Sequence, residues 1–188
     1  LVASLAVKLV LLVIDAQPRF FLGDSESYLG TSLGASVPRD RSWLYGLIAV
    51  ALIRMGHGFG LLLGLQATVG ACVAASVGTL AILRFGVSRP VAWILVLVMS
   101  VEPLALYYER SVLTETIGRA LFWGSTILLV ELAHQASLVL ALALAVATIL
   151  TVSLRTAFVP HLLLVVVTCA WLALRAVGRW RERGVYAL

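Results

Sequence analysis

Charge is scarce in this sequence. Charged residues occupy only 12% of the 188 positions, whereas apolar residues occupy 62%. Soluble domains carry roughly one quarter charged residues, so this composition excludes an ordinary soluble domain. We therefore expect an all-α, polytopic bundle of transmembrane helices.

Cysteine is scarce as well. Cys72 and Cys169 both lie within apolar stretches, where a free cysteine behaves as a small hydrophobic residue. Two such residues provide neither a disulfide framework nor the spacing of a metal site. We assign them no function.

A basic leader and a small-residue cleavage site are both missing before the first apolar run, residues 1–14. The run does not fit a cleaved signal peptide for that reason. It opens on Leu1 rather than methionine, and only Lys8 interrupts it. We expect the sequence to begin inside a first span and to form a single transmembrane domain, residues 1–188, from a longer chain.

A helix that crosses a bilayer core about 30 Å thick needs about 20 mostly apolar residues. By this criterion we expect six spans, the first of them partial. The segment 43–53 is too short to cross, and Arg41 and Arg54 flank it. We expect it to be a juxtamembrane helix within an external loop, residues 15–58, with Trp43 and Tyr45 at the lipid headgroups. The six predicted spans are residues 1–14 (partial), 59–83, 90–106, 116–131, 136–154 and 158–174.

Alternating the sides of six spans divides the charges between two faces. The arginines divide almost evenly, so their count does not fix the orientation. The acids do not divide evenly: only Glu131 and Glu182 share a face with the arginine-rich stretch 175–183. That stretch follows an apolar segment, which is typical of a cytoplasmic anchor rather than of nucleic-acid binding, despite the sequence pI of 9.8. We expect the opposite face to lie outside the cytoplasm; its acids are Asp15, Asp24, Glu26, Asp40, Glu102, Glu109 and Glu115.

Charge near a membrane is costly unless it lines water or meets a partner, so this acidic face is the predicted functional site. Three connecting pieces converge there: residues 23–28 with 37–45, then 102–116 and 153–161. In order and topology they resemble the GT-C superfamily of integral-membrane glycosyltransferases, which includes protein O-mannosyltransferases and bacterial aminoarabinose transferases. The resemblance rests on Asp24 with Tyr28, the stretch from Pro38 to Tyr45, Pro103 with Thr114 and Glu115, and Arg155 with Pro160.

The resemblance implies transfer of a sugar from a polyprenyl-phosphate donor to a hydroxyl of a lipid, glycan or protein acceptor. Asp24 is the candidate base and Glu115 a candidate catalytic partner or metal ligand. A divalent metal ion is an open expectation, with His57 and His161 as further candidate ligands, and no other cofactor is implied. Because a guanidinium suits phosphate oxygens, the candidate substrate-binding residues are Arg155, Arg41, Arg39 and Arg110, with Glu26 and Tyr28.

Other interpretations remain open for the same residues. Asp24 beside Gly23 fits a solvated turn, Glu115 fits a helix start, and Arg155 fits a side chain that reaches the headgroups. At the level of function, the alternatives are a transporter bundle and a non-catalytic partner subunit with this architecture. No predicted span shows a break at its centre, which favours the enzyme over the transporter.

Overall fold

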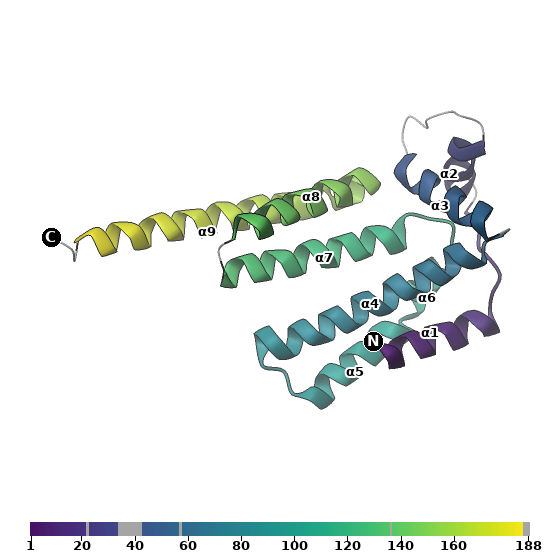
Figure 1. Ribbon diagram of the computed structural model, residues 1–188, viewed down its shortest axis with the longest axis horizontal. Helices are drawn as coiled ribbons and strands as arrows, with labels where there is room; N and C mark the ends of the chain where they lie inside the picture. The colour runs from purple at the N-terminus through teal and green to yellow at the C-terminus, as the bar shows by residue number, and fades with distance from the viewer. Residues whose placement is uncertain (22, 34–42, 57, 136, 186–188) are drawn as a thin grey trace.

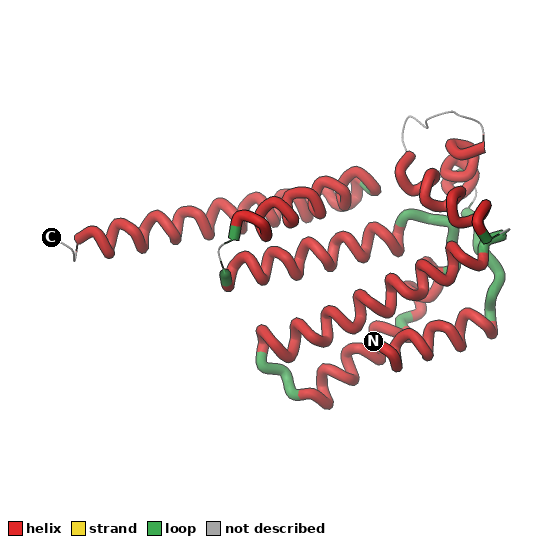
Figure 2. Tube along the Cα trace, in the orientation of Figure 1, coloured by secondary structure: helices red, strands yellow, loops and turns green. Residues whose placement is uncertain are grey.

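The computed structural model describes residues 1–21, 23–33, 43–56, 58–135 and 137–185, and no strand occurs among them (Figure 1; Figure 2). The all-α prediction is confirmed. The elements are α1 (Val2–Ile14), α2 (Asp24–Leu33), α3 (Trp43–Met55), α4 (Gly60–Phe85), α5 (Arg89–Val101), α6 (Pro103–Glu109), α7 (Glu115–His134), α8 (Leu138–Leu154), the 3₁₀ turn η1 (Thr156–Phe158) and α9 (Val159–Val185).

Among the described residues, three helices are long and apolar enough to cross a membrane, and they indicate a membrane protein. They are Gly60–Phe85, Glu115–His134 and Thr156–Arg175, and a fourth crossing exists if α5 and α6 form one bent span. The prediction of six spans is not confirmed. With 17 residues, α8 reaches only about 26 Å at about 1.5 Å per residue, short of a bilayer core about 30 Å thick.

The helices form a bundle around α4. In Figure 1, α7, α8 and α9 run along one side of α4, while α1 and α5 lie along the other, and contacts join α4 to α1, α5 and α7. The helices α2 and α3 cover one end of this bundle. We call this the connector end, formed with residues 15–21, 110–114 and 155–158, and we call the end with residues 86–88 and 134–135 the opposite end.

Ion pairs at both ends agree with the predicted alternation of charge. Arg84, near the end of α4, pairs with Glu131 of α7 at the opposite end. At the connector end, Arg155 pairs with Glu115, the first residue of α7. Each predicted face therefore gathers charges from segments far apart in the sequence.

The predicted span 90–106 is wrong as a single helix, because the chain breaks at Glu102 and bends by 50° between α5 and α6. Pro103 has no N–H to continue the helix, and it suits the first position of a new one. The Glu102 carboxylate accepts hydrogen bonds from the N–H groups of Leu104 and Ala105, at 2.9 and 2.6 Å. Glu102 therefore ends α5 and caps the amino terminus of α6.

The external loop contains more helix than the sequence analysis predicts. The expected helix is present as α3, but α2 precedes it and was not predicted. Asp24 and Glu26 lie in the first turn of α2, which is where acidic side chains favour helix formation. That pattern was an available signal for the missing helix.

The main apolar core lies at the connector end rather than in the middle of the bundle. It joins α2 and α3 to α4, α8 and the segment after α6, and its buried members are Tyr28, Tyr45, Ala49, Leu62, Val112, Leu113 and Leu154. A smaller cluster of Leu129, Leu144 and Val165 joins α7, α8 and α9. The larger of the two apolar clusters thus lies beside the predicted site.

A buried ion cluster, which we call the Lys8 cluster, ties α1 to α6 and α7. Lys8 is only 1% exposed, and its ammonium donates to both carboxylate oxygens of Glu109 at 2.6 and 2.8 Å. Arg119 of α7 lies 3.3 Å from the Glu109 carboxylate and 3.7 Å from that of Glu102. Gly70 of α4 makes room for this cluster, because a Cβ atom there would collide with the Glu109 carboxylate.

Replacing Gly70 with alanine should destabilise the bundle by about 1 to 3 kcal/mol, the usual cost of overpacking a filled interior. The measurement is the midpoint of thermal unfolding in detergent, followed by helical circular dichroism. Gly64→Ala is the matched control on the same helix, because no atom lies within 4 Å of its added Cβ and alanine favours a helix. Equal midpoints for the two variants would show that Glu109 does not occupy the space beside Gly70.

Candidate functional site

The first connector lies beside the second through a short backbone pairing. The N–H of Arg19 donates to the carbonyl of Arg110 at 2.8 Å, and the N–H of Val112 donates to the carbonyl of Arg19 at 3.0 Å. These bonds form an isolated parallel bridge between Arg19 and Ser111. Segments about 90 residues apart in the chain are therefore held in contact.

The helix α2 is attached to the same segment by side chains. The hydroxyl of Ser25 donates to the carbonyl of Val112 at 2.9 Å and accepts from the N–H of Phe21 at 2.9 Å. The Tyr28 hydroxyl lies 3.5 Å from the Thr114 hydroxyl. One face of α2 thus contacts the residue that precedes Glu115.

Gln66 of α4 holds the second connector and α3 in place through hydrogen bonds. Its amide donates to the carbonyls of Glu109 and Ser111 at 2.7 and 3.1 Å, and its carbonyl accepts from the Tyr45 hydroxyl at 3.0 Å. Burial raises the pKa of the Tyr45 hydroxyl, so it stays protonated and able to donate. Tyr45 also packs edge-on against Tyr28, with ring centroids 5.1 Å apart, and this contact links α3 to α2.

The third connector joins the site through Arg155. This arginine follows α8 and pairs with one carboxylate oxygen of Glu115. The other carboxylate oxygen is buried and has no hydrogen-bond partner among the described residues, and the same holds for the hydroxyl of Thr116. Buried oxygens that lack a partner are uncommon, so these two set this part of the site apart.

The structure places Asp24 at the first position of α2, half-buried. Residues four apart share a helix face, so Asp24 lies on the same face as Tyr28. Glu26 is exposed. Arg39 and Arg41, together with Pro38 and His57, lie outside the described residues.

Arg110 is occupied by the end of α1. It is 9% exposed, and its guanidinium donates to the carbonyls of Leu11 and Asp15 at 2.6 and 2.9 Å. The Asp15 carboxylate lies 3.4 Å away. A cation at the carboxyl end of a helix satisfies carbonyls that have no helical partner, so Arg110 fixes α1 here while Arg155 faces Glu115.

The second candidate histidine lies against α7. The Nε2 atom of His161 is 2.7 Å from the Ser125 hydroxyl, and its ring packs on Phe122 with centroids 4.5 Å apart. Within the described parts of the chain, no three histidine, cysteine or acidic side chains are grouped closely enough to hold a metal ion. The expectation of a divalent ion has no ligand set among these residues.

The Lys8 cluster and Gln66 were not among the predicted site residues. A lone cation in an apolar run, such as Lys8, is itself a signal, because it requires a partner inside the membrane. The sequence offers no comparable signal for Gln66, because its amide binds the backbone carbonyls of residues 109 and 111. Neither a protein-family model nor a curated protein nor a solved structure matches this chain.

Replacing Gln66 with leucine should lower the free energy of unfolding by at least about 2 kcal/mol. The reason is that buried carbonyls and the Tyr45 hydroxyl each lose a partner, at about 1 to 3 kcal/mol per group. The measurement is the midpoint of chemical unfolding in detergent. Gln17→Leu, the same change at an exposed position, should leave the midpoint unchanged, and a similar midpoint for both variants would contradict the role of Gln66.

Proposed function

We propose that this chain belongs to a GT-C type glycosyltransferase of a bacterial inner membrane, which transfers a sugar from a polyprenyl-phosphate donor to an acceptor hydroxyl. One observation carries the proposal: Tyr28 meets Thr114 next to the Glu115–Arg155 pair. That contact unites the three connectors whose motifs resemble the superfamily. If the three connectors lay far apart, the resemblance to the superfamily would not support the proposal.

In the proposed reaction, a carboxylate oxygen of Asp24 removes the proton of the acceptor hydroxyl. The acceptor oxygen then bonds to the anomeric carbon as the bond from that carbon to the phosphate oxygen breaks. The phosphate leaves with the electron pair, and configuration inverts. Asp24 suits the role of base because it begins α2 on the side that carries Tyr28.

The leaving phosphate requires a cation, and Arg155 is the strongest described candidate. Its side chain is 43% exposed, whereas the side chain of Arg110 is only 11% exposed and already binds α1. Arginine forms paired hydrogen bonds with phosphate oxygens. Glu115 then orients Arg155. Arg39 and Arg41 are further proposed phosphate ligands.

The proposed orientation places the connector end at the periplasmic side. It rests on the arginines at 175, 179, 181 and 183, because basic residues that follow a span favour the cytoplasm. The external acceptor would then approach the exposed side of α2.

A second candidate function is transport, and the break between α5 and α6 favours it. Transporter sites are commonly built at interrupted helices, and the Lys8 cluster lies directly beside this break. Buried ionisable groups within spans often mark a substrate path. In this alternative, the bend at Glu102 would be the moving joint; a non-catalytic partner subunit remains the third alternative.

The Asp24→Asn substitution should reduce sugar transfer by about 100-fold or more, the usual contribution of a general base. The assay measures radiolabel transferred from a polyprenyl-phosphate-linked sugar in membranes that contain the protein. Glu131→Gln at the opposite end is the matched control and should retain activity, because its partner Arg84 is partly exposed and such pairs contribute little to stability.

The result also separates the alternatives. Equal transfer by the parent protein and Asp24→Asn would reject Asp24 as the base. Substrate uptake into sealed vesicles without sugar transfer would favour the transporter, and in that case Glu109→Gln rather than Asp24→Asn should abolish uptake.

A further inference from the structure

The break at Glu102 leaves the angle between α5 and α6 without a continuous helix to fix it. Pro103 has no N–H group, and the N–H groups of Leu104 and Ala105 bond to the Glu102 side chain. The helix α6 is also short, with seven residues. Contacts with other helices must therefore set the bend of 50° between α5 and α6.

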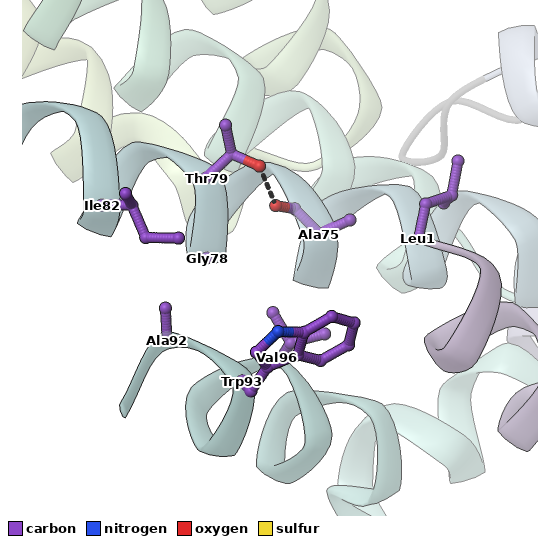
Figure 3. Close-up of a pocket in the computed structure, with 8 residues that line it drawn as sticks. All are labelled: Leu1, Ala75, Gly78, Thr79, Ile82, Ala92, Trp93 and Val96. Atoms are coloured by element: carbon purple, nitrogen blue, oxygen red, sulfur yellow. Dashed lines mark hydrogen bonds between the residues drawn. The ribbon is translucent and has the colours of Figure 1, made fainter. Parts of the chain in front are cut away.

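The helix α5 is the fixed side of this bend, because it packs closely against α4. Figure 3 shows the two helices face to face, and a Cβ atom at Gly78 of α4 would collide with the Val96 side chain of α5. Filled interiors leave little room for such helices to shift. The direction of α6 relative to α5 is what needs further support.

The helix α1 contacts both sides of the break. The hydroxyl of Ser4 lies 2.5 Å from the hydroxyl of Ser100, in the last turn of α5, and both serines are fully buried. One turn further along α1, Lys8 donates to both carboxylate oxygens of Glu109, the last residue of α6. Residues four positions apart share a helix face, so a single face of α1 binds α5 and α6 together.

The end of α1 holds the chain just after α6 as well. The guanidinium of Arg110 donates to the carbonyls of Leu11 and Asp15. Hydrogen bonds between charged groups are roughly twice as strong as neutral ones and are directional, whereas apolar contact is not directional. The contacts of α1 are therefore suited to fixing an angle, and not only to holding helices together.

We propose that α1 fixes the angle between α5 and α6, and that Lys8 is thereby a positioning residue for the site beyond α6. The segment 110–114 follows α6 directly and ends at Thr114, which meets Tyr28 beside Glu115. A change in the direction of α6 moves this segment relative to α2. The role of Lys8 in positioning rests on the proposed sugar transfer, whereas the fixed angle does not.

The experiment measures amide hydrogen exchange of the full chain in bilayers by mass spectrometry, because exchange reports the local opening of a segment. Lys8→Met should raise the exchange rate of residues 104–112 by at least about tenfold, since it removes charge-assisted hydrogen bonds. Exchange of residues 90–100 in α5 should stay unchanged. Leu9→Met is the matched control: it places the same side chain at an exposed position of α1 and should change neither rate.

Two double variants separate a fixed angle from a general loss of stability. Lys8→Met combined with Glu109→Leu replaces the ion pair with apolar side chains, which often leaves stability unchanged. Its unfolding midpoint should stay close to that of the parent, yet residues 104–112 should still exchange faster, because apolar contact is not directional. Ser4→Ala combined with Ser100→Ala should raise the same exchange about fivefold, the effect of one neutral hydrogen bond, although Ser100 lies on the α5 side of the break.

Exchange of residues 104–112 at the parent rate, in Lys8→Met or in either double variant, would overturn the proposal. An equal rise in residues 90–100 would overturn it too, because it would reflect the stability of the whole bundle. Where Lys8→Met fails to fold, as circular dichroism shows, the double variant with Glu109→Leu decides.

Sugar transfer by that double variant tests the positioning role of Lys8. Its kcat should fall by about 100-fold, the cost of misplacing reacting groups by about 1 Å, while its unfolding midpoint stays close to that of the parent. A kcat equal to that of the parent would reject Lys8 as a positioning residue. Absence of transfer by the parent itself would reject the proposed function, whereas the exchange measurements need no substrate and still decide whether α1 fixes the angle.

Discussion

The contact between Lys8 and Glu109 is the constraint on which the rest of the structure depends. Each residue carries a charge into an apolar bundle, and removing one partner of such a pair typically costs about 3 to 5 kcal/mol. The pair therefore sets the position of α1 against α6, and Gly70 sets how closely α4 can approach both. Arg119 extends the same network to α7, so four elements meet at one point.

The position of Glu109 determines where the chain emerges from the bundle. The carbonyls of residues 109 and 111 accept from Gln66, and Val112 pairs with Arg19. Backbone hydrogen bonds thus align the first two connectors, and the buried Gln66 side chain holds the second connector in position. The contact between Tyr28 and Thr114 follows from that alignment rather than causing it.

The sequence was sufficient for the features that depend on composition and length. The helical class, the long helix over Gly60–Phe85 and the sharing of faces by Arg84 with Glu131 all follow from apolar runs and their alternation. The break at Glu102 was missed, because an apolar run conceals a bend that depends on one proline and one carboxylate. The approach of the Tyr28 segment to the segment before Glu115 accords with the motif order, whereas the fixation of Arg110 by α1 depends on carbonyls that no sequence pattern reveals. Arg39 and Arg41 lie outside the described residues, so their predicted role stays a prediction.

The apolar core around Tyr28 and Tyr45 lies at the connector end, so the helices are held together more firmly there than at the opposite end. Helices that are clamped together at one end can still tilt at the other, where the pair of Arg84 and Glu131 is partly exposed and correspondingly weak. A bilayer that is thinner or thicker than the apolar helix length is accommodated by tilt. Changes in bilayer thickness would therefore be absorbed near residues 86–88 and 134–135, while the geometry around Glu115 stays constant.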